Sequence, residues 1–279
     1  MQKNLLSNAL KGLQLRIKKM FANPFSKIGI SLYNLKLIKN QPDNKLHTTT
    51  FLQGSISYYN SYELLHGLRE IFIDEIYKIT LPENPAVIDC GAHIGLSVIY
   101  FKHICPSAKI IAFEPDKKNF DLLAANIQSF NLKDITLRNE AVWINNTQIS
   151  FNNEGNMASR IETSPDASQT NIMTVNAVRL KEIITGKVHF LKLDIEGAEY
   201  EVLKDIQDKL HFIDNMFVEY HGSFEQNIRL NEMLQMVSAN GFSYYIREAA
   251  AVYPTPFHRN LQDSHEYDVQ LNIFCFKNQ

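Results

Sequence analysis

A short apolar segment that runs into two glycines is the feature that most restricts the fold of this chain. Residues 86–90 are small or apolar except for Asp89, and Gly91 and Gly95 follow closely. An unbroken apolar stretch of this length is typical of a strand buried on both faces of a parallel sheet. Glycine lets the backbone turn sharply after it, because glycine has no Cβ. A strand, a glycine turn and a helix N-terminus together predict a site for a nucleotide-like small molecule.

The glycine spacing argues against a dinucleotide as that molecule. A dinucleotide site has the pattern Gly-x-Gly-x-x-Gly, with backbone amides directed at a pyrophosphate. This chain has two glycines in residues 91–95, and the carboxylate of Asp89 before the turn would repel a pyrophosphate. A nucleoside with a cationic tail and no phosphate, such as S-adenosylmethionine, suits the segment better. A plain structural turn between a strand and a helix is the alternative for this segment taken alone.

A second apolar strand is predicted at residues 109–113, and it ends at Glu114. Doubly wound folds place an acid about 20 residues beyond the glycine turn, at the tip of the second strand, where it binds ribose hydroxyls. Pro115 follows and is tolerated in the first turn of a helix. We therefore interpret Glu114 as a ribose ligand rather than only an acid favoured by a helix dipole.

Composition limits the compartment and the class of partner. The chain has 279 residues, 45% of them hydrophobic, which is enough for one large domain with a small appendage. Its net charge of −2 gives no bias toward nucleic acid. Cys90, Cys105 and Cys275 are widely spaced and predict neither a disulfide framework nor a zinc site, so we expect a cytoplasmic protein. No apolar run reaches the ~18 residues that would span a bilayer.

The N-terminal part is expected to form a separate extension over residues 1–61. Its first 21 residues have leucines at helical spacing with lysines between them, and no cleavage site of a secretory signal. Such a basic amphipathic helix packs on its own domain, on a second copy of the chain, or on an anionic membrane surface. Residues 22–60 are predicted to be irregular or partly β. The main domain, residues 62–279, is expected to begin with an amphipathic helix over residues 62–79.

Strands and helices then alternate, which indicates an α/β fold with a parallel sheet. Asn145 and Asn146 are a weak hairpin signal between two short strands. The polar segment 152–171 is too long for a plain connection and is interpreted either as a substrate lid or as surface disorder. The remaining predictions are helices over 96–105 and 117–130, and strands over 135–137, 139–143, 147–151, 188–193 and 215–220.

Acidic side chains gather after the predicted strand over residues 188–193. Asp194, Glu196 and Glu199 follow it, and open α/β sheets bind ligands at this carboxyl edge. Lys192 lies inside the apolar strand, on the same face as Asp194, and needs a partner if it is buried. A cluster of acids that caps a helix explains Glu199 well but explains Asp194 and Lys192 poorly.

A histidine follows the next predicted strand, residues 215–220. His221 is thus placed at the same edge, close to Asp194 if the two strands are neighbours, and next to Glu219. Histidine is the side chain best suited to take a proton near neutral pH. A structural role and a catalytic role are left equally open for it.

These motifs, in this order, resemble the FkbM family of S-adenosylmethionine-dependent methyltransferases. The resemblance covers roughly residues 62–277 and rests on residues 70–77, 87–95, 112–116, 139–142, 191–197 and 218–221. His93 departs from the family, which often has asparagine there. The resemblance implies a doubly wound, Rossmann-like, seven-stranded sheet of the class I methyltransferase type, with its last strand antiparallel over residues 267–276. It also implies transfer of the sulfonium methyl group to a hydroxyl oxygen.

The resemblance also assigns roles by position. Asp89, Gly91 and Gly95 would hold the methionine part, Glu114 the ribose, and residues 140–142 the adenine, with Asp194 near the methyl group. The full set of expected cofactor ligands is Asp89, Gly91, Ala92, His93, Gly95, Leu96, Glu114, Pro115, Glu140, Ala141, Val142 and Asp194. The expected acceptor is a small molecule or glycan, consistent with polysaccharide biosynthesis or natural-product methylation, with no nucleic acid involved.

The proposed chemistry needs a base, because the acceptor alcohol loses its proton in the transition state. We expect His221 or Asp194 to take it, with Glu196 and Lys192 setting the local field. A metal ion held by Asp194, Glu196 and Glu219 is an alternative without dedicated ligand spacing. The late aromatic segment with Tyr244, Tyr245, Tyr253, Phe257, His258 and Arg259 is a candidate acceptor pocket or an ordinary strand and loop. An NAD-dependent oxidoreductase and a non-catalytic relative are the other function classes.

Overall fold

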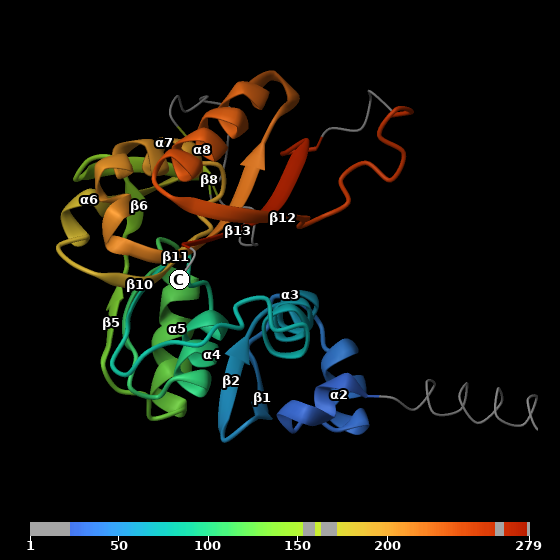
Figure 1. The fold of residues 1–279 in the computed structure, drawn as a ribbon. Helices are drawn as coiled ribbons and strands as arrows, with labels where there is room; N and C mark the ends of the chain where they lie inside the picture. Colours follow the sequence, from blue (N-terminus) through green and yellow to red (C-terminus); the bar gives the residue numbers. More distant parts are fainter. Residues whose placement is uncertain (1–22, 153–159, 163–171, 260–264, 278–279) are drawn as a thin grey trace, which may run out of the picture. The chain divides into compact units, whose positions relative to one another are not determined.

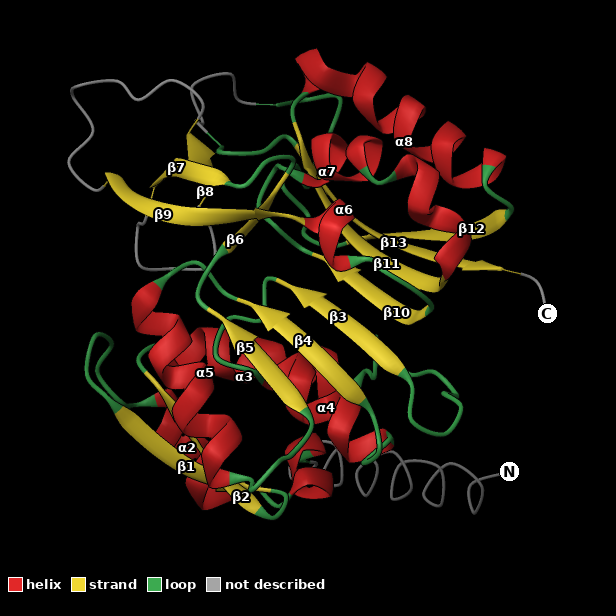
Figure 2. Cartoon of the chain, turned by 90° about the vertical axis from the view of Figure 1, so that its left-hand side faces the viewer, coloured by secondary structure: helices red, strands yellow, loops and turns green. Residues whose placement is uncertain are grey.

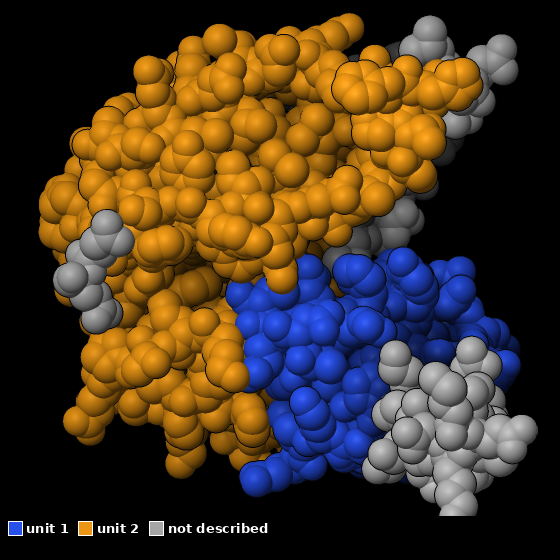
Figure 3. Space-filling view, turned by 45° about the vertical axis from the view of Figure 1, so that its right-hand side comes forward, with its two compact units in different colours: residues 1–76 blue, residues 77–279 orange. Residues whose placement is uncertain are grey.

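The computed structural model describes residues 23–152, 160–162, 172–259 and 265–277 (Figure 1). The chain divides into two compact units, residues 1–76 and residues 77–279 (Figure 3). The basic segment 1–21 and most of the polar segment 152–171 lie outside the described residues, so the predictions made for them stay predictions. Within the described ranges, every helix is too short or too polar to cross a membrane.

The first unit consists of short helices around a hairpin. The hairpin pairs β1 (His47–Phe51) with β2 (Gly54–Tyr58) in antiparallel register, as expected for a partly β segment. Phe51, Ile56 and Tyr58 alternate toward a buried face, and the ring of Phe51 meets the edge of Phe72 at 5.2 Å. The helical elements are η1 (Pro24–Ile28), α2 (Leu32–Lys39), α3 (Ser61–Leu68) and η2 (Arg69–Ile73).

The helix predicted over residues 62–79 is shorter than expected. Asn60 caps α3 by accepting hydrogen bonds from the amides of Tyr62 and Glu63. After α3 the chain widens into the single π-helical turn η2, where the amide of Asp74 donates to the carbonyl of Arg69. Glu75 then has a φ of 51°, a left-handed conformation that cannot continue the helix. The apolar periodicity beyond residue 73 is therefore not helical.

The second unit is built on the expected seven-stranded sheet. Its strand order is β12-β13-β11-β10-β3-β4-β5, in which β11, β10, β3, β4 and β5 are parallel neighbours. The predicted antiparallel last strand is confirmed, because β13 runs against both β11 and β12. The strands are β3 (Ala86–Cys90), β4 (Lys109–Phe113), β5 (Ile135–Arg138), β10 (Val188–Leu193), β11 (Ile213–Gly222), β12 (Phe242–Glu248) and β13 (Val269–Lys277).

Helices cover both sides of this sheet. Figure 2 shows α4 (Leu96–Ile104) and α5 (Lys117–Ser129) on one side of β3, β4 and β5, and α7 (Glu199–Asp205) and α8 (Asn227–Ala239) on the other side of the sheet. The main apolar core lies between the strands and α7 and α8, with Leu191, Val202 and Met233 fully enclosed. Burial of such side chains stabilises the sheet by roughly 1.5–3 kcal/mol each.

A small second sheet is inserted between β5 and β10, in the order β6-β9-β7-β8. The predicted hairpin at Asn145-Asn146 is wrong, because β6 and β7 do not pair with each other. Both pair with β9 instead, β6 in parallel and β7 in antiparallel register, so β9 separates them. The strands of this sheet are β6 (Ala141–Trp143), β7 (Thr147–Asn152), β8 (Arg160–Glu162) and β9 (Ile172–Arg179), followed by the short helix α6 (Leu180–Ile183).

The register of the large sheet brings the motif residues to one edge. Cys90 is aligned with Phe113 on one side and with Leu193 on the other, and Leu193 is aligned with Val218. The residues that follow these positions therefore emerge side by side, as the sequence predicts. Strand β11 extends two residues beyond the predicted strand at each end, so His221 lies within the strand and pairs with Gln270 of β13.

Replacing Gly91 with alanine is expected to destabilise the second unit strongly. Gly91 has a φ of 94°, and a Cβ there would lie 1.9 Å from the carbonyl oxygen of Asp194. Backbone strain and steric overlap together cost about 2–4 kcal/mol of unfolding free energy. Gly186→Ala is the matched control, because its Cβ meets nothing within 4 Å. Urea unfolding measures both variants, and equal midpoints for the two would contradict this account of the turn.

Candidate active site

The glycine turn after β3 packs against the end of β10. The amides of Gly91 and Ala92 both donate to the carbonyl of Phe113, at 3.1 and 2.8 Å. The amide of Asp194 donates to the carbonyl of Cys90, at 3.1 Å. The close approach that requires a glycine at position 91 is thus to the backbone of Asp194. Position 95 also requires glycine, because a Cβ there would lie 2.7 Å from the side chain of Leu123 in α5.

Lys192 links this turn to two carboxylates. Its Nζ donates to the carbonyl oxygen of Gly91 at 2.6 Å and to Oδ2 of Asp194 at 3.0 Å, and it lies 3.5 Å from Oδ1 of Asp89. The lysine side chain is buried. Burial by itself would lower the pKa of Lys192, but the negative charges of Asp194 and Asp89 raise it well above its ordinary value. Lys192 is therefore a permanent cation. It was expected to need a partner if buried, and it has two, Asp89 and Asp194.

Asp89 lies beneath the turn rather than on its surface. Its side chain is fully buried, and Oδ2 accepts a hydrogen bond of 2.5 Å from the hydroxyl of Ser97. Its Oδ1 accepts no hydrogen bond from the described residues. Because Lys192 compensates its charge, Asp89 sets the position of the lysine and of the first turn of α4. The contact expected between Asp89 and the cofactor stays a prediction.

Glu114 lies at the tip of β4 and is tied to two backbone amides. Its Oε2 accepts from the amide of His93 at 2.8 Å, and its Oε1 accepts from the amide of Asp116 at 3.0 Å. Asn139 supports the same loop by donating to the carbonyls of Glu114 and Pro115. Burial raises the pKa of Glu114 to about 8, although the two amides oppose this shift. Each carboxylate oxygen can accept one further hydrogen bond.

His93 contributes its backbone to this arrangement. It has a φ of 47°, which directs its amide toward Glu114. Burial lowers the pKa of the imidazole to about 4, so the ring is neutral at pH 7. A neutral ring at this position adds no positive charge to the turn. The unusual residue at position 93 therefore preserves the charge balance that an asparagine would give.

Glu199 organises the loop after β10. Its side chain is fully buried, and its carboxylate accepts hydrogen bonds from the amides of Ile195 and Gly197 at 3.1 Å. Its Oε1 also lies 3.3 Å from Nδ1 of His221 on the neighbouring strand β11. The sequence predicts only a helix-start acid at this position. In the structure Glu199 holds both the loop and the histidine.

His221 is surrounded by acids. Its Nε2 lies 3.5 Å from Glu196 and 3.8 Å from Glu219, in addition to the contact of Nδ1 with Glu199. Burial alone would lower its pKa, but the hydrogen bond and charge of Glu199, with the charges of Glu196 and Glu219, raise it to about 10. The imidazole therefore carries a proton on each nitrogen at neutral pH. Such a ring donates hydrogen bonds but cannot take up a proton.

Glu196 is the carboxylate most affected by its surroundings. Burial raises its pKa to about 9, and the positive charge of His221 opposes the shift. Its backbone has a φ of 53°, and its carbonyl accepts a hydrogen bond of 3.0 Å from the hydroxyl of Tyr267. The ring of Tyr267 also packs on His221, with centroids 4.8 Å apart. Tyr267, two residues before β13, thus packs on the site from the side opposite β10.

The structure brings the catalytic candidates together and keeps the ribose candidate apart. Lys192 contacts Asp194, and His221 contacts Glu196. Glu114 follows β4, which β3 and β10 separate from β11. At roughly 4.8 Å per strand, Glu114 is about 14 Å from the histidine. The edge is therefore long enough to hold a nucleoside at one end and a reacting group at the other.

The residues predicted to contact adenine are less accessible. Glu140 forms an ion pair with Arg138, while Ala141 and Val142 are buried in β6. Ala92 and Leu96 are buried in the turn and the first turn of α4, and Pro115 is half-buried. Of the three residues expected to contact adenine, the half-buried Glu140 is the one that remains open to a ligand.

Three residues near the site were not found from the sequence. Ser97 binds Asp89, and its polarity within an apolar helix was a usable signal. Tyr77 packs its ring on Phe217 and interacts electrostatically with Lys192 and Asp194. Tyr267 reaches Glu196 only because β13 returns beside β11. No local pattern indicates these last two contacts.

The late aromatic segment is divided by the fold. Tyr244 and Tyr245 lie in the middle of the edge strand β12 and are exposed, as is Phe257. Tyr253 stacks on Phe224 with centroids 5.6 Å apart, and its hydroxyl donates to Asp268 at 2.6 Å. The guanidinium of Arg259 lies 4.3 Å from the centre of the Phe224 ring.

This aromatic cluster of Phe224, Tyr253 and Arg259 is adjacent to the catalytic candidates. The amide of Asp268, which holds the cluster, donates to the carbonyl of Gly222 at 2.9 Å, one residue after His221. The cluster lies at the carboxyl end of β11, whereas Tyr244 and Tyr245 do not. An acceptor bound there would be near the acids.

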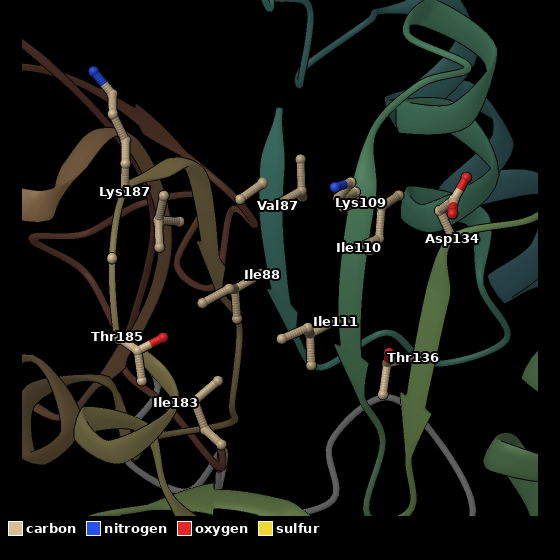
Figure 4. Close-up of a pocket in the computed structure, with 13 residues that line it drawn as sticks. Val87, Ile88, Lys109, Ile110, Ile111, Asp134, Thr136, Ile183, Thr185 and Lys187 are labelled. Atoms are coloured by element: carbon tan, nitrogen blue, oxygen red, sulfur yellow. The ribbon is translucent and has the colours of Figure 1, made fainter. Parts of the chain in front are cut away.

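A cavity of about 360 Å³ lies elsewhere on the sheet (Figure 4). It is lined from the amino-terminal ends of the strands, by residues such as Lys109 and Val188, and by the segment with Thr185. It contains none of the predicted site residues. The chemistry-bearing side chains are thus at the opposite edge of the sheet from this cavity.

Three side chains at this edge could hold a metal ion. Asp194, Glu219 and His221 offer ligand atoms within 4.8 Å of one another, whereas the alternative drawn from the sequence has Glu196 in place of His221. We derive no step from a metal at this site.

Comparison with known proteins identifies the family to which this chain belongs. The family model described as "Methyltransferase FkbM domain" matches residues 89–244, which is more than half of the chain. The match begins at the buried aspartate of β3 and ends in β12, so it includes every catalytic candidate.

Individual proteins are also similar to this chain. "Methyltransferase 1" of Beauveria bassiana (strain ARSEF 2860) is 29% identical over 182 residues, which are 56% of this chain and 72% of that protein. "Hexuronic acid methyltransferase AglP" of Haloferax volcanii is 29% identical over 147 residues, 51% of this chain and 59% of that protein. A crystal structure of methyltransferase FkbM from Methylobacillus flagellatus KT is 16% identical with a TM-score of 0.48, over 72% of this chain and 46% of that one. The chain belongs to the FkbM methyltransferase family, whose cofactor is S-adenosylmethionine.

Proposed function

We propose that this methyltransferase transfers a methyl group to a hydroxyl oxygen of a sugar or glycan, with an acidic sugar as the preferred acceptor. The observation that carries the proposal is a carboxylate, Asp194, held by a buried lysine at the edge where the strands β3, β10 and β11 end. Bound S-adenosylmethionine would supply an activated methyl group. The protein must then orient the acceptor oxygen, exclude water and take up one proton.

The charges at this edge fit a cationic cofactor. At neutral pH the raised pKa values of Glu114 and Glu196 leave these two groups mostly protonated. The carboxylates of the remaining acids still outnumber the cations Lys192 and His221; these acids are Asp89, Asp194, Glu199 and Glu219. The buried Oδ1 of Asp89 still accepts no hydrogen bond from the described residues. A positively charged ligand relieves this excess, whereas a pyrophosphate would add to it. Glu114 would hold the ribose, the turn from Gly91 to Gly95 the amino acid part, and Glu140 the adenine.

We assign the proton uptake to Asp194 rather than to His221. The side chain of Asp194 is 21% exposed, and its Oδ2 is fixed by Lys192. Its Oδ1 has no donor among the described residues and can accept a proton from a hydroxyl group. His221 already carries its proton at neutral pH, so its task is to hold Glu196, Glu199 and Glu219 in place.

The aromatic cluster supports a sugar as acceptor. Tyr253 and Phe224 present rings next to the acids, and rings of this kind stack on the apolar faces of sugars. Arg259 adds a cation that can bind a carboxylate with two hydrogen bonds. The relative from Haloferax volcanii is named as a hexuronic acid methyltransferase. These points together favour a uronic acid over a neutral sugar.

An acceptor screen with labelled S-adenosylmethionine tests the substrate class. We expect label transfer to glycans that contain uronic acids, and at least tenfold less transfer to matched neutral glycans. Arg259→Leu should remove this preference while leaving transfer to neutral glycans unchanged, because only the carboxylate loses its partner. Transfer confined to non-sugar natural products, or an unchanged preference in the variant, would reject the assignment.

Asp194→Asn should lower kcat at least about 100-fold, since a positioned base contributes roughly that much. Binding of S-adenosylhomocysteine should change less than threefold, because the assigned role is in proton transfer. Asp121→Asn is the control, as its carboxylate is exposed and pairs only with Lys117 among the described residues. Steady-state kinetics and calorimetry measure these effects. Wild-type turnover by Asp194→Asn would transfer the role to another residue, with His221→Gln the next variant to measure.

Glu114 should make cofactor binding depend on pH. Its pKa is about 8, and ribose hydroxyls donate to the ionised form, so bound cofactor favours the carboxylate. The dissociation constant of S-adenosylhomocysteine should therefore fall roughly tenfold or more between pH 6.5 and pH 8.5. Glu114→Gln should bind more weakly and with little dependence on pH. Equal pH profiles for the two proteins, measured by calorimetry, would show that Glu114 does not contact the ligand.

A further inference from the structure

The charges of this chain are distributed very unevenly along the sequence. Residues 1–46 contain nine lysines and arginines but a single acid, Asp43, which gives them a net charge of +8. The whole chain has a net charge of −2, so the remaining residues carry −10. An asymmetry of this size indicates a surface that meets an anionic partner. It lies outside the methyltransferase site.

The helix α2 in the first unit (Figure 1) carries apolar side chains on two opposite faces. Ile38 points inward and is 2% exposed. On the other face Leu32, Tyr33 and Leu37 are 41%, 70% and 48% exposed. Large apolar side chains exposed together on one face of a helix are typical of a surface that meets a partner. The outer face of α2 therefore has the composition of a contact surface.

Exposed lysines lie on α2 and on both sides of it in the sequence. Lys36 is one turn after Leu32 on the same face, and Lys39 ends the helix. Lys27 precedes α2, and Lys45 follows it beside the exposed Leu46. None of these four lysines forms an ion pair with any residue that the structure describes. Their charges are therefore available to an external anion.

Charge decides which partner can cover the outer face. The preceding residues 1–22 are basic and contain no acid, so the lysines around α2 would repel them. A second copy of the chain would bring the same lysines together across a two-fold axis. A nucleic acid would match the charge but would leave Leu32 and Leu37 without an apolar environment. A bilayer with anionic lipids satisfies both, because leucine and tyrosine enter the interface while lysine heads remain among the phosphates.

We propose that the outer face of α2, formed by Leu32, Tyr33, Lys36 and Leu37 and flanked by Lys27, Lys39 and Lys45, docks the protein on an anionic membrane surface. Each lysine near such a surface adds about 1 kcal/mol, which is screened by salt. The exposed apolar side chains then fix the depth and orientation of the first unit at the interface. The neighbouring basic residues 1–22 strengthen the attraction without being required for this contact.

Vesicle flotation of the full chain tests the proposal. Wild-type protein should bind vesicles of 70% phosphatidylcholine and 30% phosphatidylglycerol at least tenfold more tightly than pure phosphatidylcholine vesicles. The triple variant Leu32→Gln, Tyr33→Gln, Leu37→Gln should lose at least tenfold of this binding, with unchanged circular dichroism. Glutamine suits an exposed helix, so folding is preserved. Lys36→Glu with Lys39→Glu should lose binding and its dependence on salt.

The matched control is Ile228→Gln with Tyr245→Gln, because both residues are equally exposed in the second unit and lie far along the sequence from the lysines. This variant should bind as the wild type does. Retained binding by the triple variant would place the contact in another segment and overturn the proposal. Loss of a dimer in the same variant, seen by ultracentrifugation without any vesicle binding, would assign the face to a second copy and also overturn it.

Discussion

The buried ammonium group of Lys192 is the interaction on which the site depends. It joins the glycine turn after β3 to the end of β10 by contacting Asp89, Asp194 and the carbonyl of Gly91. Removing a single partner of such a buried group leaves a charge without compensation, which costs several kcal/mol. The same contacts hold Asp194 in one orientation. Stability and chemistry therefore rely on the same atom.

A second buried ionic cluster joins the end of β11 to the loop after β10, as Lys192 joins the ends of β3 and β10. Glu199 is fully buried, accepts hydrogen bonds from two backbone amides and pairs with His221. The histidine is thereby kept charged, and it holds Glu196 and Glu219 near Asp194. Carboxylates that would repel one another are thus placed together by two enclosed cations. The resulting edge is acidic, partly closed to water and suited to a cationic cofactor.

Several strands of the large sheet could be predicted, because buried strands have unbroken apolar sequences. Residues 86–90, 109–113 and 188–193 form the strands β3, β4 and β10 with the predicted ends, since unbroken apolar runs followed by acids leave few alternatives. The hairpin at Asn145-Asn146 failed because the distant strand β9 pairs with both of its expected halves. The first helix ended early because Glu75 adopts a left-handed conformation, which no periodicity reveals.

The sequence by itself determined the alternation of the strands β3, β4, β5 and β10 with helices, the two glycines of the turn, and the acids at the strand ends, because these depend on local periodicity and backbone sterics. Only the tertiary structure decided which charges face one another. The sequence places His221 near acids, but only the fold shows that Glu196, Glu199 and Glu219 surround it and raise its pKa. The sequence places Asp89 before the turn, but only the fold shows that Lys192 and Ser97 contact its carboxylate. Protonation and access depend on neighbours that only the folded sheet brings within a few ångströms.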